Sequence, residues 1–280
     1  MSIKLENVNY IYEDGTINRF RALKDINLEV NDGEFVGLIG HTGSGKSTLI
    51  QHFNGLVKPT EGVVSYNGED IFGEKYNRKN LRLEVGLVFQ YPEHQLFEAE
   101  VLQDVAFGPR NQGLSETEAL IKAKEALALV GIGENYYNKS PFELSGGEKR
   151  KVAIAGILAM EPKILILDEP TAGLDPKGRD NILELLKRIH GERKITVILV
   201  SHSMEDIAKY VDRMIVMNKG SIMYDDSPKK IFRYHKELEE IGLAAPQITY
   251  LMQRLKESGY DVDENATTIE EALKGLNINA

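Results

Sequence analysis

The chain has 280 residues, a formal net charge of −9 and no cysteine. The absence of cysteine excludes disulfides, thiolate metal sites and cysteine nucleophiles, and it fits a location in the cytosol. The acidic balance argues against nonspecific binding to nucleic acid or anionic lipid. The longest apolar runs, 164–167 and 196–200, have the length of strands, whereas a membrane span needs about 20 apolar residues. The first residues lead straight into a strand pattern, so we expect no signal peptide.

The N-terminal part of the chain has the residue pattern of β-structure. Apolar and β-branched residues predict strands within 3–12, 26–39 and 63–66. The last of these is expected to turn back as a hairpin at Asn67-Gly68. The part at 35–39 is uniformly apolar apart from one glycine, so we expect it to be a buried strand that leads into a glycine-rich loop and then a helix.

The middle of the chain is predicted to be mainly helical. Ser115 and Glu118 have the spacing of a capping box, in which each residue caps the backbone of the other. The helix that they open is expected to run to about Val130 and to end at Gly131. Helical patterns then continue to about residue 159.

Strands and helices alternate again after this helical stretch. Strands are expected at 164–167 and 196–200, with a helix near 177–190 between them. This alternation indicates a mostly parallel sheet that is covered on both faces. The helical stretch at about 95–160 interrupts the pattern like an inserted subdomain. The residues from Asp226 onward are helical and charged in pattern, and we expect them to form a separate extension.

A phosphate-binding motif lies between the strand at 35–39 and the helix that follows it. Residues 40–47 read GHTGSGKS and satisfy the pattern G-x-x-x-x-G-K-[ST]. Glycines allow the backbone N–H groups to wrap the phosphates, Lys46 adds a positive charge, and the Ser47 hydroxyl can ligate Mg²⁺. The alternative is a glycine-rich turn with an incidental lysine, but a chance match in a chain of this length has a frequency of about one per cent.

Two acidic residues follow the apolar strand at 164–167. Asp168 at the strand end can hold Mg²⁺ through its water shell, as in other P-loop enzymes. Glu169 can polarise the attacking water as a general base. The alternative is that both acids merely cap a helix. The phosphate loop and the following Pro170-Thr171 favour the catalytic interpretation.

A phosphate loop and an acidic strand leave kinases, helicases, GTPases and ABC ATPases open. Residues 144–148 read LSGGE and resemble the LSGGQ signature of ABC ATPases, about 20 residues before the acidic strand as in that family. The resemblance covers nearly the whole chain, with Glu148 as its one departure. It implies an α/β fold with a RecA-like P-loop NTPase core, an antiparallel β subdomain, an inserted helical subdomain and a C-terminal helical extension. The implied domains are an ATPase domain at 1–225 and the extension at 226–280.

The companion motifs of the ABC family follow in order. Gln90 resembles the Q-loop glutamine, 172–175 the D-loop, His202 the switch histidine and Tyr12 the aromatic residue that stacks on adenine. Taken singly, each has an ordinary structural explanation, but their joint order favours the ABC interpretation. In the family, the signature loop of one subunit faces the phosphate loop of another, so the resemblance implies a dimer that closes on two ATP molecules.

The resemblance thus implies ATP and Mg²⁺ as cofactors and three groups of site residues. The catalytic group is Glu169, His202 and Gln90. The metal ligands are Ser47, Gln90 and Asp168. The nucleotide contacts are Tyr12, Gly40, His41, Thr42, Gly43, Ser44, Gly45, Lys46, Ser47, Thr48, Ser145, Gly146 and Gly147.

Further segments resemble one group within the family. The sequences FQYPEHQLF at 89–97, DVAFGP at 104–109 and EKRKVAIAG at 148–156 look like the ATPases of energy-coupling-factor importers. The amino-acid sequences of 89–97 and of the tail at 242–259 resemble the second of the two paralogous, CbiO-like ATPases of such systems. The implied partners are a second homologous ATPase, a transmembrane coupling protein and substrate-binding membrane proteins, with no nucleic acid.

This resemblance implies a peripheral protein on the cytoplasmic face of a bacterial cell membrane, which drives the uptake of vitamins or other micronutrients. The transported substrate is chosen by another polypeptide in such systems. The alternatives are the ATPase of another ABC transporter, for cobalt or nickel uptake or for export, and a soluble ABC protein that acts on nucleic acid or ribosomes. The latter usually has two ATPase domains, a coiled-coil insertion or a basic face, and the sequence has none of these.

Overall fold

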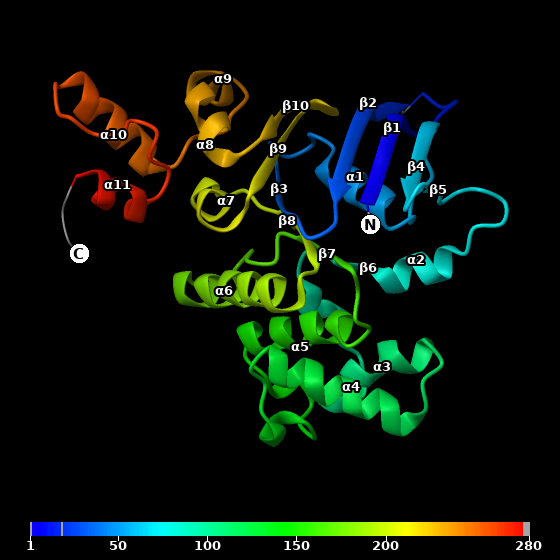
Figure 1. Cartoon of the computed structure of the whole chain (residues 1–280). Helices are drawn as coiled ribbons and strands as arrows, with labels where there is room; N and C mark the ends of the chain where they lie inside the picture. The colour runs from blue at the N-terminus through cyan, green and yellow to red at the C-terminus, as the bar shows by residue number, and fades with distance from the viewer. Residues whose placement is uncertain (1, 18, 277–280) are drawn as a thin grey trace.

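A six-stranded sheet forms the centre of the computed structural model, which describes residues 2–17 and 19–276. The strand order is β10-β9-β3-β8-β7-β6 (Figure 1). All neighbouring pairs are parallel except β9 with β10. β8 separates β3, which leads into the phosphate loop, from β7, which ends in the acids, and this order confirms the RecA-like core. The bounds are β3 (Phe35–Ile39), β6 (Val85–Val88), β7 (Ile164–Asp168), β8 (Thr196–Val200), β9 (Arg213–Asn218) and β10 (Ser221–Asp226).

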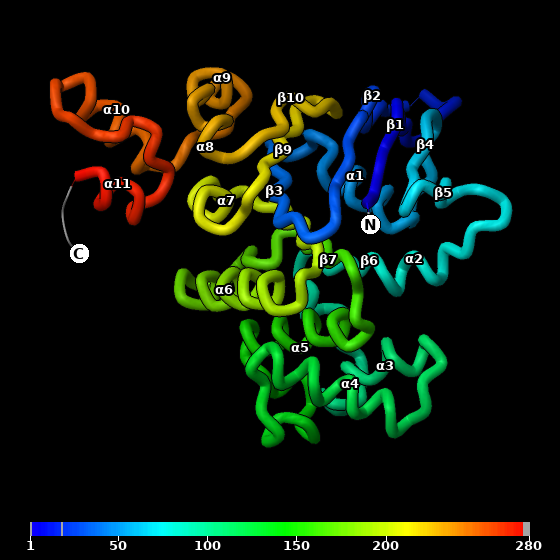
Figure 2. The backbone as a smooth tube through the Cα atoms, viewed as in Figure 1, coloured from blue at the N-terminus to red at the C-terminus, as the bar shows by residue number. Residues whose placement is uncertain are grey.

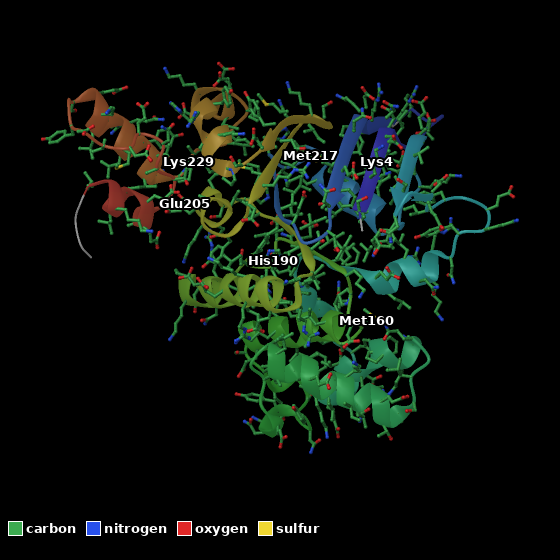
Figure 3. The ribbon with its side chains drawn as sticks, viewed as in Figure 1. Lys4, Met160, His190, Glu205, Met217 and Lys229 are labelled. Atoms are coloured by element: carbon green, nitrogen blue, oxygen red, sulfur yellow. The ribbon has the colours of Figure 1, made fainter. Side chains whose placement is uncertain are left out.

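Both faces of this central sheet are buried, as the apolar runs predict. Along β8, Val197 and Leu199 belong to one hydrophobic cluster, whereas Ile198 and Val200 belong to another. The first cluster joins the sheet to the helices, and the second joins it to a smaller sheet and to helix α1 (Lys46–Phe53). Met217 on β9 is fully buried in the second cluster, whereas Lys4 lies on the smaller sheet, partly exposed (Figure 3).

The smaller sheet is antiparallel and has the order β2-β1-β4-β5. Asn67 and Gly68 both have positive φ, at 53° and 82°, and their turn joins β4 to β5. The predicted hairpin is therefore confirmed. β2 begins at Phe20, before the predicted start at residue 26. The prediction missed this first part of the strand because several polar residues interrupt the apolar pattern there. The bounds are β1 (Ser2–Tyr12), β2 (Phe20–Asn31), β4 (Glu61–Tyr66) and β5 (Glu69–Asp70).

A group of helices lies on the opposite side of the central sheet from β1 and β2 (Figure 1). Ser115 and Glu118 cap each other at the start of α4, and Gly131 lies just past its end with φ of 76°. The predicted capping box is confirmed. Between 131 and 145, however, the backbone forms only two short 3₁₀ turns. The bounds of this group are η1 (Pro92–Gln95), α3 (Val101–Asn111), α4 (Glu116–Leu129), η2 (Glu134–Tyr136), η3 (Pro141–Glu143) and α5 (Gly146–Leu158). Helix α2 (Arg78–Glu84) lies outside the group, because its Leu81 belongs to the second cluster.

The C-terminal helices divide into two groups by their packing. Ile231, Phe232 and Leu238 belong to the main hydrophobic cluster of the ATPase core. Met252 and Val262 belong to a separate small cluster, at the projecting orange and red end of the chain (Figure 2). The domain division at residue 226 stays a prediction. The bounds are α6 (Pro176–Arg193), α7 (Met204–Tyr210), α8 (Pro228–Ile231), η4 (Phe232–Tyr234), α9 (His235–Glu240), α10 (Gln247–Glu257) and α11 (Ile269–Gly275).

Within 2–17 and 19–276, no helix is both long and apolar enough to cross a membrane.

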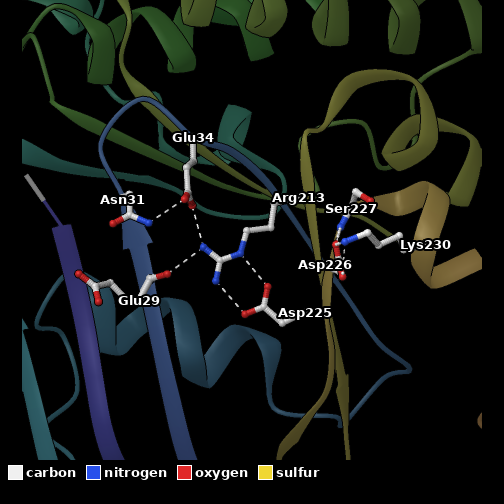
Figure 4. Close-up of polar contacts among 8 residues, drawn as sticks. All are labelled: Glu29, Asn31, Glu34, Arg213, Asp225, Asp226, Ser227 and Lys230. Atoms are coloured by element: carbon white, nitrogen blue, oxygen red, sulfur yellow. Dashed lines mark hydrogen bonds and ion pairs between the residues drawn. The ribbon is translucent and has the colours of Figure 1, made fainter.

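Arg213 joins the two sheets at the start of β9 (Figure 4). Its Nε and Nη2 donate to the two carboxylate oxygens of Asp225, each at 2.7 Å. Its Nη1 donates to a carboxylate oxygen of Glu34 and to the carbonyl oxygen of Glu29, each at 2.8 Å. The hydrogen bonds that Arg213 donates to Asp225, together with the negative charges of Asp225 and Glu34, raise its pKa above the usual value, although burial acts in the opposite direction. One guanidinium thus connects β9 and β10 with β2 and the residue before β3.

We expect Arg213→Ala to lower the free energy of unfolding by about 1–3 kcal/mol. The reason is that the partly buried carboxylates of Glu34 and Asp225 lose their charged hydrogen bonds. Lys230→Ala is the control, since it breaks only the exposed pair with Asp226 and should leave the unfolding midpoint unchanged. Urea denaturation followed by circular dichroism measures both. Equal midpoints for the two variants would contradict the structural role of Arg213.

Candidate functional site

The candidate site lies at the carboxyl ends of the parallel strands. In a parallel sheet these ends share one edge, which is where such folds bind ligands. The residues that follow β3, β6, β7 and β8 supply the phosphate loop, Gln90, Glu169 and His202 respectively. Together they surround a cavity of about 360 Å³. Its lining residues are Phe20, Ala22, Thr42, Gly43, Gly45, Lys46, Ser47, Thr48, Gln90, Glu169 and His202.

The phosphate loop is closed on itself by Lys46. The Nζ atom donates to the carbonyl oxygens of Gly40 at 2.7 Å and His41 at 3.1 Å. Gly45 precedes α1 with φ of 105°, and a Cβ there would lie 2.7 Å from the carbonyl oxygen of Ala22. Only glycine therefore fits this position without a shift of the backbone. The loop presents the N-terminus of α1 to the cavity, which is an arrangement that binds anions.

Lys46 carries the positive charge of the cavity. It is 6% exposed, and burial lowers its pKa, although the negative charges of Glu169 and Asp168 act in the opposite direction. A buried ammonium group is costly unless counter-charges compensate it. A bound phosphate would supply this compensation directly.

Asp168 lies at the end of β7, close to the start of α1. Its Oδ2 atom accepts a hydrogen bond of 3.2 Å from the Ser47 hydroxyl. Burial, followed by the negative charge of Glu169, raises its pKa. The described residues contain no group of three His, Cys, Asp or Glu side chains that could hold a metal alone. Oxygen ligands from one carboxylate and one hydroxyl fit Mg²⁺, which keeps several waters and also takes phosphate oxygens.

The carboxylate of Glu169 is held between two side chains from neighbouring strand ends. Gln90 Nε2 donates to Oε2 at 3.0 Å, and His202 Nε2 lies 2.6 Å from Oε1. The backbone of Glu169 has a positive φ of 49°, and its N–H donates to the carbonyl oxygen of Val200 at 3.1 Å. Residues in this region of backbone space are often found at functional sites. The three side chains meet although the sequence separates them widely.

The aromatic wall of the cavity differs in part from the sequence expectation. Tyr12 bonds to the Thr48 hydroxyl at 3.1 Å and is 38% exposed, but it does not line the cavity. Phe20, which is its partner in the register of β1 and β2, does line it. Sequence reasoning missed Phe20 and Ala22, because only the hairpin register places them there.

The signature residues lie apart from this cavity. Ser145, Gly146 and Gly147 form the start of α5, and none of them lines the cavity. Glu148 completes a capping box, in which its Oε2 accepts from the Ser145 hydroxyl at 2.7 Å and from the Ser145 N–H at 2.8 Å. These hydrogen bonds, with one from Tyr136, lower the pKa of Glu148. The departure from glutamine therefore keeps the cap and adds a negative charge.

Comparison with known proteins agrees with this geometry. The family model described as "ABC transporter" matches residues 23–172. The energy-coupling factor transporter ATP-binding protein EcfA2 of Caldanaerobacter subterraneus subsp. tengcongensis is 58% identical over 99% of this chain and 96% of its own length. The chain belongs to the ABC transporter ATP-binding proteins of the energy-coupling factor type. The EcfA2 protein of Clostridium tetani is 56% identical over the same shares of the two chains. The ATPase therefore binds ATP and couples its hydrolysis to transport.

Solved structures show the same fold. The cbiO1 protein of Clostridium perfringens, described as part of the ABC transporter complex cbiONQ, is 42% identical, with a TM-score of 0.76. The similarity covers 90% of this chain and 98% of that one. The ABC transporter cassette MJ0796, in a dimeric structure, is 34% identical, with a TM-score of 0.69 over 81% of this chain and 98% of that one. These similarities confirm the P-loop NTPase fold.

We expect Lys46→Ala to weaken ATP binding by at least about 10-fold, because charged hydrogen bonds contribute about 1.5–3 kcal/mol. Lys236→Ala, on the exposed side of α9, is the control and should bind ATP like the wild type. Isothermal titration with ATP, together with a thermal melt to verify folding, measures the effect. Unchanged ATP affinity in a folded Lys46→Ala variant would contradict the phosphate-loop assignment.

Proposed function

We propose that this ATPase is one of two different ATP-binding subunits of an importer for vitamins or other micronutrients. It binds a transmembrane coupling protein and acts with substrate-binding membrane proteins on the cytoplasmic face of a bacterial cell membrane. One observation carries the proposal: the cavity holds the phosphate loop, Gln90, Glu169 and His202, but none of the signature residues. A single chain therefore contains half of each composite site. The names of the EcfA2 relatives support the importer type.

The missing half is supplied by a partner subunit in this proposal. The start of α5 presents the backbone N–H groups of the signature glycines, which suit a phosphate. Ser145, Gly146 and Gly147 would contact ATP held by the partner, and the partner's signature would contact ATP held here. ATP then stabilises the closed dimer, and hydrolysis releases it.

The chemistry of hydrolysis is assigned to side chains at the sheet edge. Mg²⁺, when bound with ATP, would neutralise phosphate charge, and Ser47, Gln90 and Asp168 would contribute its ligands. The hydrogen bond between Ser47 and Asp168 and the place of Ser47 and Gln90 in the cavity lining support this assignment. Glu169 polarises the attacking water, and Gln90 and His202 hold its carboxylate in place. The phosphates contact the loop residues Gly40, His41, Thr42, Gly43, Ser44, Gly45, Lys46, Ser47 and Thr48.

The adenine ring is assigned to the aromatic pair at the ends of β1 and β2. Tyr12 and Phe20 are opposite each other in the sheet, and both are exposed, at 38% and 56%. A base can stack on either ring. Tyr12 is held in place by an edge-on contact with Tyr10, at 4.8 Å between ring centroids.

The surface for the membrane partner is assigned to residues 91–97, the docking segment. Tyr91 and Phe97 are 42% and 59% exposed, and Phe97 packs edge-on against Phe107, which is 41% exposed. Contiguous exposed apolar groups mark protein contacts, and the rings of Phe97 and Phe107 form such a pair. Asp104 fixes the backbone here, because its carboxylate accepts from the N–H groups of Phe97 and Glu98, each at 2.8 Å.

The ATPase of another kind of ABC transporter is the second candidate, because the cbiO1 protein, which is part of the ABC transporter complex cbiONQ, is 42% identical to this chain. The EcfA2 relatives are more similar, at 56–58% identity, and favour the energy-coupling-factor importer. Affinity purification of the tagged chain from host membranes, followed by mass spectrometry, tests the proposal. We expect a second, nonidentical ATPase and a transmembrane protein to copurify. Recovery of this chain alone would contradict it.

We expect Glu169→Gln to lower ATP turnover by at least about 100-fold, since a general base contributes about 10²–10⁴-fold. ATP should still bind and hold the dimer closed. Phosphate release and size-exclusion chromatography with ATP measure the two effects, and Glu192→Gln, on the exposed face of α6, is the control. Full hydrolysis by Glu169→Gln would refute the assignment of the general base.

We expect Phe97→Ser to reduce copurification with the membrane partner and to uncouple transport, while the ATPase activity of the purified pair of ATP-binding subunits is largely retained. The reason is that Phe97 is exposed and lies outside the nucleotide cavity. Leu56→Ser removes another exposed apolar side chain, which is 44% exposed, and is the matched control. Normal copurification of Phe97→Ser would argue against this docking surface.

A further inference from the structure

Arg150 is a buried charge that the proposed reaction does not yet use. It lies in the first turns of α5, just after the signature, and is 1% exposed. Burying a guanidinium group is costly unless its N–H groups are paired. A position of this kind therefore indicates a set of dedicated partners.

Those partners come from two separate segments. Arg150 Nε and Nη2 donate to the two carboxylate oxygens of Glu93, at 3.1 Å and 2.6 Å. Its Nη1 donates to the carbonyl oxygens of Pro170 at 3.0 Å and Ala172 at 2.7 Å. Glu93 lies in the docking segment, whereas Pro170 and Ala172 lie in the turn that begins at Glu169. One side chain thus connects the signature helix, the docking segment and the turn that carries the proposed base.

The turn after Glu169 is short and internally bonded. The N–H of Ala172 donates to the carbonyl oxygen of Glu169 at 3.1 Å, so the Ala172 carbonyl held by Arg150 lies one turn away from the base. A second contact joins the same two segments, because the ring of Tyr91 lies beside Gly173, 3.7 Å from where a Cβ would stand. Tyr91 and Glu169 both have positive φ, at 54° and 49°, which surrounding contacts must maintain.

The Glu93–Arg150 pair is charged and largely shielded from water. The side chain of Glu93 is 16% exposed and that of Arg150 is 2% exposed. Burial by itself raises the pKa of Glu93, but the hydrogen bonds and the charge of Arg150 leave that pKa below its usual value. Lysine could not replace Arg150, because one ammonium group cannot reach the Glu93 carboxylate and the two carbonyl oxygens that the planar guanidinium group bonds together.

We propose that Arg150 is a positioning residue, which holds the turn that carries Glu169 and makes its position depend on the docking segment. Movement of the docking segment against the membrane partner is then transmitted through Glu93 and Arg150 to the proposed base. This inference rests on the proposed roles of Glu169 and of residues 91–97.

The test compares Arg150→Lys, Glu93→Gln and the double variant in the ATPase purified with its partner subunits. We expect each single variant to lower kcat by about 10-fold, because a slightly displaced general base slows the chemical step. The KM for ATP should stay within about twofold of the wild-type value. The double variant should have nearly the same kcat as Arg150→Lys, since both changes break one link. Glu93→Gln is the milder change, and it keeps the test valid if Arg150→Lys folds poorly.

Arg213→Lys is the matched control, because Arg213 also bonds carboxylates and a carbonyl group through its fork but lies away from the cavity. It should lower the melting temperature and leave kcat within about twofold. The inference is overturned if folded Arg150→Lys and Glu93→Gln keep the wild-type kcat. It is also overturned if the two losses of kcat multiply in the double variant, or if Arg213→Lys loses as much kcat as they do. If Glu169→Gln itself retains full hydrolysis, the proposed function fails instead.

Discussion

The shared carboxyl edge of the parallel sheet decides where every charged group of the site can lie. β3, β6, β7 and β8 are neighbours in one sheet and run in the same direction, so the residues that follow them must converge. The sheet is buried on both faces by alternate side chains. This packing leaves the edge as the place where polar groups from all four strands meet a common cavity.

The electrostatics of the cavity follow from that convergence. Lys46 is buried among backbone carbonyl groups, and Asp168 and Glu169 lie across from it. Burial is the largest cause of both pKa shifts, because it lowers the pKa of Lys46 and raises the pKa of Asp168. Both charged forms are therefore stabilised when a ligand brings the opposite charge, a triphosphate for the lysine and a cation for the aspartate.

The coupling proposed for this ATPase depends on helix α5. The signature residues lie at the start of α5, outside the cavity that the phosphate loop lines. Arg150 on the same helix contacts both the docking segment and the turn after Glu169. In the proposed coupling, these two segments and the start of α5 would move together, because one buried side chain bonds both segments and a well-packed interior transmits displacement. Such a design suits an ATPase whose output is the closing and opening of an assembly.

The sequence by itself determined the features that depend on neighbours along the chain. The phosphate loop, the capping box at Ser115 and the hairpin turn at Asn67-Gly68 are local, because residue type and short spacing decide them. Only the tertiary structure brought Gln90 and His202 onto the two oxygens of Glu169. It alone decided that Phe20 lines the cavity, that Arg150 is buried and that Arg213 joins the sheets. These contacts join distant residues, and their geometry depends on strand register and packing, which no local pattern encodes.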